Sequence, residues 1–578
     1  MMQLARFLKN YKKEVIIGPI FKLTEAIFEL IVPIVMMKII DIGIKNKDMT
    51  YVLQMGGILV LLGVVGLGCS LTCQFFAAKA SQGFGTDVRN ALFKHIISFS
   101  HSEIDQFGTP SLITRLNNDV NQLQVAVAML IRLVVRAPFL AIGATIMAIL
   151  LDLQLSVIFL ITAPFIALIL YLVMSKSIPF YKNIQKGLDK VSLIIRENLS
   201  GSRVIRAFSK QKYEEQRFIE ASDELKNKAL QVGKISALLS PLTTIVINFA
   251  IIAIVWWGGI RVNVGSFSQG EIIAFVNYLS QILIALIIVA NLVVLFTKAF
   301  ASAKRVNELF DTTSSICEPS VIGNTIVDTK TKIILRDVCF SYQDSQEYSL
   351  HNINLSIQKG ETIGIIGGTG AGKSTLIQLL PRFYDVTSGE ILIDGMDVRH
   401  QSLQTLRKQF GIVPQRAVLF SGTIRDNMKW ANPNASDEEI NQALEIAQAK
   451  DFVDQLENGL DTIIVQDGKN LSGGQKQRLT IARALVGNPQ ILILDDSASA
   501  LDYATDAALR KAIHKQIKHT TVLIVSQRVS AVKSANRIVV LDDGEIAGIG
   551  THQELFNACQ VYKDICLSQL SDEEVARG

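Results

Sequence analysis

Six long apolar stretches precede residue 300, and each is long enough to span a lipid bilayer. They run roughly over residues 15–42, 52–79, 124–151, 154–177, 235–260 and 271–299. A helix needs about 20 mainly apolar residues to cross a hydrocarbon layer about 30 Å thick. The pattern therefore predicts six membrane-spanning helices.

The polar segments between these stretches are uneven in length. Only Asp152 and Leu153 join the third stretch to the fourth, whereas about 45 residues separate the second from the third and about 57 the fourth from the fifth. Within these long connections, Gln82–Phe99 and Lys182–Asn198 keep a helical periodicity, which indicates that the helices continue beyond the membrane. Gly108 and Pro110 break the first pattern within residues 107–110, and Gly201 breaks the second within residues 199–202. We expect a short coupling segment at each tip, near Ser102–Phe107 and Gly201–Ala207.

Basic residues predict the orientation of the spans. The connection between the fourth and fifth stretches is rich in Lys and Arg, whereas the third connection has none and the fifth has only Arg261. An excess of Lys and Arg marks the cytoplasmic side of a membrane protein. We therefore expect a multi-pass protein of the cell membrane with both termini in the cytoplasm.

After residue 300 the pattern changes to that of a soluble domain. Residues 301–330 form a polar linker, and short apolar runs then alternate with helical segments: KIILRDVCF, ETIGIIG, EILIDG, QILILDD, TVLIVS and RIVVLDDG. Such alternation is typical of an α/β domain. The predicted architecture is a six-helix α-helical transmembrane domain over 1–300, a linker over 301–330 and an α/β phosphate-loop domain over 331–578.

Composition supports a membrane protein and argues against a nucleic-acid partner. Hydrophobic residues make up 49% of the 578 residues and charged residues only 19%. A soluble protein of this size is rarely so apolar. The net charge of +5 is small for the length, and the chain has no basic stripe with interleaved aromatics of the kind that binds nucleic acid.

A phosphate-binding loop follows the strand ETIGIIG. Its residues are Gly367, Gly368, Thr369, Gly370, Ala371, Gly372, Lys373, Ser374 and Thr375, which match the pattern G-x-x-x-x-G-K-S in the required strand–loop–helix setting. Glycines let the backbone wrap phosphates, while backbone N–H groups and the helix N-terminus attract them. Lys373 is expected to reach the β- and γ-phosphates of ATP, and Ser374 to hold Mg²⁺. Asp495, at the end of the buried strand ILILDD, is the expected magnesium-positioning carboxylate.

Between these two motifs, five residues match a family signature letter for letter: Leu471, Ser472, Gly473, Gly474 and Gln475. Together with Gln415 in IVPQ, Tyr342 in VCFSY and the segment Ser499, Ala500, Leu501 and Asp502, they make the chain resemble the ATP-binding cassette (ABC) transporters. The six-helix pattern with long extensions is similar to that of their exporter-type half-transporters. The resemblance extends over essentially the whole chain.

The resemblance implies a role for each motif. Two cassettes close head to tail, so that the signature of one chain faces the γ-phosphate bound on its partner. Tyr342 would stack on adenine, although it could instead be a core residue. Gln415 would reach Mg²⁺ or the attacking water, although it could instead be a surface residue. The loop of Gln415 would contact the cytoplasmic tips of the membrane domain.

Two residues depart from the family pattern. Asp496 stands where the family usually has the Glu that polarises water, and it is shorter by one methylene, or roughly 1.5 Å of reach; a misplacement of about 1 Å can cost about 100-fold in rate. Gln527 stands where the family usually has a switch His, and it cannot carry a proton. Both changes affect the chain's own phosphate-loop site, whereas its signature is intact. The combination resembles the degenerate-site subunit of heterodimeric bacterial exporters, although a drifted but active homodimer is the simpler alternative.

Polar residues inside the predicted spans are candidates for substrate contact, because their burial in lipid is unfavourable. Lys22, Glu25 and Glu29 share one face of the first helix and either form ion pairs or, in the case of the acids, face a cavity that attracts cationic substrates. Arg132 and Arg136 in the third helix admit the same two interpretations. Asn277, Gln281 and Asn291 in the sixth either bond to other helices or line a path.

The expected function is ATP-driven export of amphipathic compounds, drugs or lipids, by alternating access, with a second, different half-transporter as the partner. The alternatives are an importer on the same fold, for example of metal chelates, a homodimeric exporter, and an ATP-gated channel or regulatory membrane ATPase.

Overall fold

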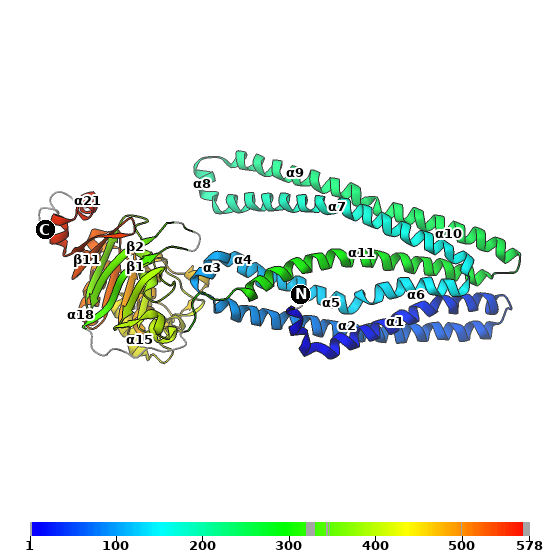
Figure 1. Cartoon of the computed structure of the whole chain (residues 1–578), viewed down its shortest axis with the longest axis horizontal. Coiled ribbons are helices and arrows are strands. Elements are labelled where there is room, and N and C mark those ends of the chain that lie inside the picture. The colour runs from blue at the N-terminus through cyan, green and yellow to red at the C-terminus, as the bar shows by residue number, and fades with distance from the viewer. Residues whose placement is uncertain (1–2, 319–329, 343–344, 346, 499, 570–578) are drawn as a thin grey trace. The chain divides into compact units, whose positions relative to one another are not determined.

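The computed structural model describes residues 3–318, 330–342, 345, 347–498 and 500–569. The chain forms two compact units (Figure 1). The first comprises residues 1–97 and 109–312, and the second comprises residues 98–108 and 313–578. The short segment 98–108 therefore belongs with the second unit, although it lies within the first 300 residues of the chain.

The first unit is entirely helical. Its α-helices are α1 (Lys12–Lys38), α2 (Met49–Ile97), α4 (Thr109–Thr114), α5 (Val120–Met129), α6 (Arg136–Leu151), α7 (Leu153–Ser200), α8 (Ser202–Ala207), α9 (Gln211–Ala237), α10 (Leu239–Asn263) and α11 (Gln269–Asp311). A 3-10 turn (Leu4–Tyr11) precedes α1, and π-helical turns follow α1 (Ile39–Ile44), α4 (Arg115–Asp119) and α5 (Leu130–Val134).

Five helical segments are long and apolar enough to cross a membrane, among the residues described: Met49–Ile97, Thr109–Leu151, Leu153–Ser200, Gln211–Asn263 and Gln269–Asp311. The first predicted span also forms a helix, α1, with Pro19 and Pro33 inside it. Because α1 carries Lys22, Glu25 and Glu29, it does not qualify by composition alone.

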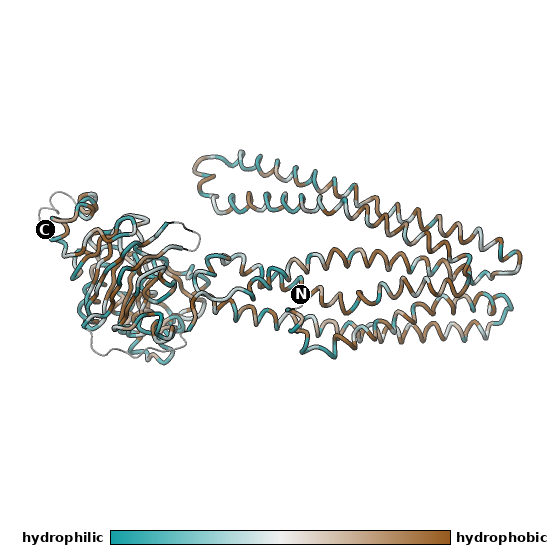
Figure 2. Tube along the Cα trace, viewed as in Figure 1, coloured by the Kyte–Doolittle hydropathy of each residue, from teal (hydrophilic) through white to brown (hydrophobic). Residues whose placement is uncertain are grey.

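The predicted helical extensions are confirmed. Helices α2 and α7 contain 49 and 48 residues, or about 70 Å at 1.5 Å per residue, which is more than twice the thickness of the hydrocarbon layer. Figure 2 shows their apolar residues in one part of their length and polar residues towards the α8 end of α7. There α7 and α9 run side by side, joined by ion pairs of 2.8 Å (Lys190–Glu224) and 2.9 Å (Arg217–Glu197).

The second unit is an α/β domain. Its strands are β1 (Thr331–Phe340), β2 (Leu350–Gln358), β3 (Thr362–Gly367), β4 (Ser388–Ile393), β5 (Met396–Asp397), β6 (Phe410–Val413), β7 (Gly422–Thr423), β8 (Ile463–Ile464), β9 (Ile491–Asp495), β10 (Thr521–Val525), β11 (Arg537–Asp542) and β12 (Glu545–Gly550). Its α-helices are α3 (His101–Phe107), α12 (Lys373–Leu379), α13 (Leu403–Lys408), α14 (Ile424–Met428), α15 (Asp437–Ile446), α16 (Lys450–Asp454), α17 (Gly473–Val486), α18 (Tyr503–Gln516), α19 (Val529–Val532), α20 (His552–Ala558) and α21 (Gln560–Gln569). All six strands expected from the sequence are present.

Strand order places the functional segments at one edge. The larger sheet runs β12-β11-β3-β10-β9-β6, with β11, β3, β10, β9 and β6 parallel and β12 antiparallel. Strands β3, β10 and β9 are adjacent, and their buried Val, Ile and Leu side chains fill the core on both faces. In parallel sheets the carboxyl ends of neighbouring strands meet, and ligands bind beyond them. The residues that follow β3, β9 and β10 therefore face one common space.

Candidate ATP-binding site

The phosphate loop connects β3 to α12. Gly370 and Gly372 have φ angles of 87° and 88°, a left-handed conformation that only glycine adopts readily. A side chain at Gly372 would also lie 2.8 Å from the carbonyl oxygen of Ser349. The glycines are thus required by backbone geometry, and the predicted strand–loop–helix setting is confirmed.

Lys373 is folded against this loop. Its Nζ donates to the carbonyl oxygen of Gly367 at 3.0 Å and to that of Gly368. Burial lowers the pKa of Lys373, while the nearby Asp496 and Asp495 act in the opposite direction. A buried ammonium group next to backbone N–H donors suits the binding of a phosphate chain.

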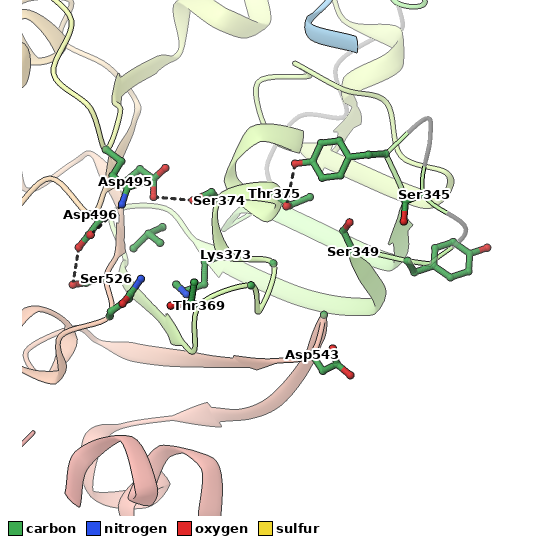
Figure 3. A pocket seen from close by; sticks show the side chains of 18 of the residues that line it. Ser345, Ser349, Thr369, Lys373, Ser374, Thr375, Asp495, Asp496, Ser526 and Asp543 are labelled. Atoms are coloured by element: carbon green, nitrogen blue, oxygen red, sulfur yellow. Dashed lines mark hydrogen bonds between the residues drawn. The ribbon is translucent and has the colours of Figure 1, made fainter. Parts of the chain in front are cut away.

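The loop forms one wall of a cavity of about 540 Å³ (Figure 3). The cavity gathers most of the residues predicted for this chain's own site: Tyr342, Thr369, Gly370, Gly372, Lys373, Ser374, Thr375, Gln415, Asp495, Asp496 and Gln527. Tyr342 stands at its rim, 36% exposed, and its hydroxyl is 3.2 Å from that of Thr375.

Asp495 and Ser374 supply oxygen atoms suited to Mg²⁺. The Ser374 hydroxyl donates to Asp495 Oδ1 at 3.3 Å. Burial raises the pKa of Asp495, and the neighbouring Asp496 adds to the effect. A divalent cation would stabilise the charged form of Asp495 against burial. Mg²⁺ prefers oxygen ligands of this kind. These residues therefore fit the cofactor that the loop implies.

Asp496 is close to the site but weakly held by side chains. Its carboxylate accepts from Gln415 Nε2 at 3.5 Å and from the Ser526 hydroxyl at 3.4 Å, both at the long limit of hydrogen bonding. Its φ of 42° places it in the left-handed region, which a non-glycine residue rarely adopts. The backbone is better fixed, since Asp496 N–H donates to the Val525 carbonyl at 2.8 Å.

Gln527, at the switch position, is exposed at the cavity and held through its backbone. Gln569, in the last turn of α21, donates from Nε2 to the Gln527 carbonyl at 2.7 Å and accepts from the Val529 N–H at 2.9 Å. Gln569 could not be singled out from the sequence, because it lies 42 residues from Gln527 and no motif marks it.

Several other lining residues were not predicted. They are Ser345, Glu347, Tyr348, Ser349, Val525, Ser526, Asp543 and Gly544. Ser526 could have been found, because it follows β10 directly and parallel strands end together. Asp543 and Gly544 lie in the β11–β12 turn, which no motif marks.

The signature segment does not line this cavity within the described part of the chain. Ser472 begins α17: its hydroxyl accepts from Gln475 N–H at 3.3 Å, and Gln475 Oε1 accepts from Ser472 N–H at 2.8 Å. No atom lies within 4 Å of a Cβ placed on Gly473. The signature therefore presents an open helix N-terminus. Of the adjacent segment, Ser499 lies outside the described residues, Ala500 contacts Gly474, Leu501 is buried and Asp502 caps α18.

Four of the five charged residues singled out within the predicted spans form ion pairs. Lys22 Nζ lies 2.6 Å from Glu25, and Arg136 Nη2 lies 2.6 Å from Glu29. Glu25, Glu29 and Arg136 also line an open groove of about 410 Å³ beside α1 and α2. Arg132 makes no hydrogen bond or ion pair among the described residues of the chain.

Two polar residues of α11 behave differently. Asn277 is exposed and donates to the Ile273 carbonyl of its own helix at 2.9 Å. Gln281 instead donates across to the Glu29 carbonyl of α1 at 3.1 Å, which leaves its Oε1 buried without a partner among the described atoms. Of these two residues, Gln281 bridges two helices and Asn277 does not, among the described contacts.

Comparison with known proteins agrees with this geometry. Residues 15–305 match the family "ABC transporter transmembrane region", which includes α1, and residues 350–499 match "ABC transporter". The chain is 39% identical over 573 residues to the "Uncharacterized ABC transporter ATP-binding protein YfiB" of Bacillus subtilis, covering 99% of both. It is 34% identical over 517 residues to an "ATP-dependent lipid A-core flippase" of Syntrophus aciditrophicus, covering 89% of this chain and 86% of that one.

The fold is shared with a solved structure described as a bacterial Atm1-family ABC exporter with ATP bound. The TM-score is 0.78 at 23% identity, with 98% of this chain and 99% of that chain covered. A helical membrane unit, a phosphate loop beside paired carboxylates and an open signature helix are thus combined in one chain, which belongs to the ABC transporter family and has the exporter fold.

Proposed function

We propose that this chain is the degenerate-site subunit of a heterodimeric ABC exporter that moves amphipathic compounds out of the cytoplasm. The observation that carries the proposal is the contrast between the two half-sites on one chain. The half-site around the phosphate loop has Asp496 and Gln527 at its catalytic positions, whereas the signature at Ser472–Gln475 keeps every residue that a partner's ATP needs.

The geometry around Asp496 supports poor hydrolysis at this chain's own site. A catalytic base must come within about 2.6–3.2 Å of the proton that it removes. The Asp496 carboxylate has 3.5 Å and 3.4 Å contacts to Gln415 and Ser526, and one methylene less of reach than the usual Glu. Gln527 has no titratable proton to offer. ATP binding is unaffected by either residue, because Lys373, Ser374 and Asp495 are in place.

Exposed apolar side chains support an assembly of two chains. The hairpin tip leaves Val204 and Phe208 60% and 73% exposed, and the α/β unit leaves Phe420 and Trp430 42% and 62% exposed, stacked at 4.1 Å. Such surfaces in a cytoplasmic region mark contacts with another protein surface. In the proposed cycle, ATP clasped between two chains closes the α/β units, the tips transmit the closure to the helices, and hydrolysis at the partner's site resets them.

An amphipathic substrate agrees with the helical unit and with one of its relatives. The groove beside α1 and α2 combines Phe28, Val32 and Leu59 with Glu25, Glu29 and Arg136, so that it offers apolar and polar contacts side by side. A lipid A-core flippase, 34% identical, acts on an amphipathic lipid by its name. We propose the same broad class for this chain, with both termini in the cytoplasm.

Two substitutions test the assignment in a pair reconstituted with the second half-transporter. Asp496→Ala is expected to leave ATP turnover within about twofold, because this site contributes little hydrolysis. Gly474→Glu is expected to abolish turnover, because it places a bulky carboxylate at the helix N-terminus that faces the partner's γ-phosphate. Turnover is measured by phosphate release, and export by ATP-dependent uptake into inside-out vesicles.

The reverse pattern, turnover lost with Asp496→Ala and retained with Gly474→Glu, would refute the degenerate-site assignment. Brisk turnover by the chain alone that is lost with Asp496→Ala would establish the homodimeric exporter instead. Uptake into right-side-out vesicles would indicate an importer.

A further inference from the structure

The nucleotide cavity adjoins a second cavity in the same unit, and the two share Tyr342 and Ser345 in their linings. The second cavity measures about 460 Å³ and lies between α3, the end of β1 and the loop that precedes β4. Tyr342 lines both cavities. A movement of the Tyr342 ring on ATP binding would therefore change the second cavity, which α3 lines.

Tyr384 occupies the α3 side of this boundary. Its ring meets that of Tyr342 edge-on, with ring centres 5.4 Å apart, and that of Phe340 at 5.6 Å. Its hydroxyl donates to Asp105 Oδ2 of α3 at 2.5 Å. This hydrogen bond is charge-assisted, because a neutral hydroxyl donates to a carboxylate. Such bonds are stronger than hydrogen bonds between two neutral groups. Burial and the adjacent Asp105 both raise the pKa of Tyr384, so it stays protonated and remains a donor.

The remaining contacts of α3 hold its position without touching the nucleotide cavity. His101 stacks on Phe383 with ring centres 4.5 Å apart. At the helix start, the Ser100 hydroxyl is 2.9 Å from that of Ser315, and Glu103 Oε1 accepts from Ser315 N–H at 3.0 Å. His101 also approaches Tyr384, with ring centres 5.9 Å apart. Among the described residues, the Asp105–Tyr384 bond is the one hydrogen bond that ties α3 to a residue packed on Tyr342.

We propose that Tyr384 is a positioning residue through which the nucleotide-facing ring of Tyr342 controls how α3 is held by Asp105. A base stacked on Tyr342 fixes the orientation of that ring, which Tyr384 packs against. The orientation of Tyr384 in turn sets the length and direction of its bond to Asp105. Helix α3 joins α2 to α4 in the chain, so its movement reaches the helical unit without a further contact. The proposal rests only on ATP binding at this chain's phosphate loop and not on whether ATP is hydrolysed there.

The test measures two properties of the full chain in lipid nanodiscs. Mg²⁺–ATP binding is followed with a fluorescent ATP analogue, and backbone hydrogen exchange of residues 100–107 is followed with and without ATP. In the wild type, ATP is expected to change the exchange of this segment about fivefold. Tyr384→Phe keeps the ring but removes the hydroxyl, and Asp105→Ala removes the acceptor; both should reduce the ATP-dependent change to less than about twofold, with ATP affinity within about twofold of wild type.

Two controls separate this role from a general loss of structure. Asp105→Asn keeps an oxygen that accepts from Tyr384, so most of the ATP-dependent change should remain. Tyr181→Phe removes a hydroxyl from an exposed tyrosine of α7 and should change neither property. The proposal is wrong if Tyr384→Phe keeps the full ATP-dependent change in exchange, or if it abolishes ATP binding, since Tyr384 would then belong to the nucleotide site itself. A loss of ATP binding in the wild type would refute the proposed function as well.

Discussion

Asp496 and Gln527 are the residues on which the proposed difference between two subunits depends. Both line the cavity. In the proposed function, Asp496 is too short and Gln527 lacks the titratable proton for efficient hydrolysis. Lengthening Asp496 to Glu and replacing Gln527 by His should therefore restore ATP hydrolysis at this site, because the surrounding phosphate loop and Asp495 are intact.

We expect Asp496→Glu with Gln527→His to raise hydrolysis at this site by about tenfold or more, since a positioned base contributes about 10²–10⁴-fold and about 1 Å of misplacement costs about 100-fold. The measurement is phosphate release by a pair in which the partner's own catalytic carboxylate is removed, so that only this site reports. Adding Lys373→Ala to the double variant serves as the control and should return release to background. No gain in the double variant would mean that these two positions do not limit hydrolysis.

The switch loop depends on a second residue, Gln569, which bonds to both Gln527 and Val529 through one amide group. Gln569→Ala removes two hydrogen bonds. Each stabilises the folded state by about 1 kcal/mol when shielded from water, and by less where it is exposed. Hydrogen exchange of residues 526–530 should rise about five- to tenfold, while that of the neighbouring strand β10 stays unchanged. Ser568→Ala, at an exposed neighbour that bonds only to its own helix, is the matched control. Equal exchange in the two variants would contradict the role of Gln569.

At the scale of elements, the docking of α3 should weaken in mild acid. Burial against Phe383 lowers the pKa of His101 below its ordinary value of 6.5; Arg407, from α13, acts in the same direction, while Asp105, on α3 itself, opposes it. Undocked His101 therefore binds a proton between the lowered pKa and pH 6.5, where docked His101 does not. Since the undocked state gains protons as the pH falls below 6.5, docking loses free energy in that window.

We expect hydrogen exchange of residues 100–107, corrected for its intrinsic pH dependence, to increase between pH 7.5 and pH 5.5. His101→Phe keeps the stack on Phe383 without a titratable group, so the increase should disappear. An unchanged increase in His101→Phe would show that another group is responsible.

Elements also show what the sequence could and could not predict. The apolar periodicity and motif settings predicted α2, α7, β3 and β9 because each is fixed by its own residues, by length, alternation or glycine content. The pairing of His101 with Phe383 and of Gln569 with Gln527 was not predictable, because each contact joins segments far apart in the chain that carry no motif. For the charged residues of α1 the sequence left two interpretations, and the structure shows both features, because Glu29 pairs with Arg136 and both residues line a groove.

For the whole molecule, the proposed heterodimer predicts that ATP has different fates on the two subunits. In the proposed pair, this chain contributes Lys373, Ser374 and Asp495 to its own nucleotide and its signature to the partner's nucleotide. If hydrolysis occurs only on the partner, the nucleotide on this chain keeps its γ-phosphate through many turnovers. The asymmetry is a property of the pair and is absent from either chain alone.

Photo-crosslinking during turnover measures this asymmetry. We expect the pair, labelled with an azido-ATP carrying a radioactive γ-phosphate, to retain that label on this chain and to lose it from the partner, whereas a label on the α-phosphate stays on both. The double variant Asp496→Glu with Gln527→His supplies the control, since its γ-label should fall towards the level of the partner. Equal loss of the γ-label from both wild-type chains would require two competent sites, and the contrast between Asp496 and the signature at Gly474 would then have no consequence for the cycle. Retention on this chain alone would mean that its ATP holds the two subunits together while the partner's ATP drives each transport step.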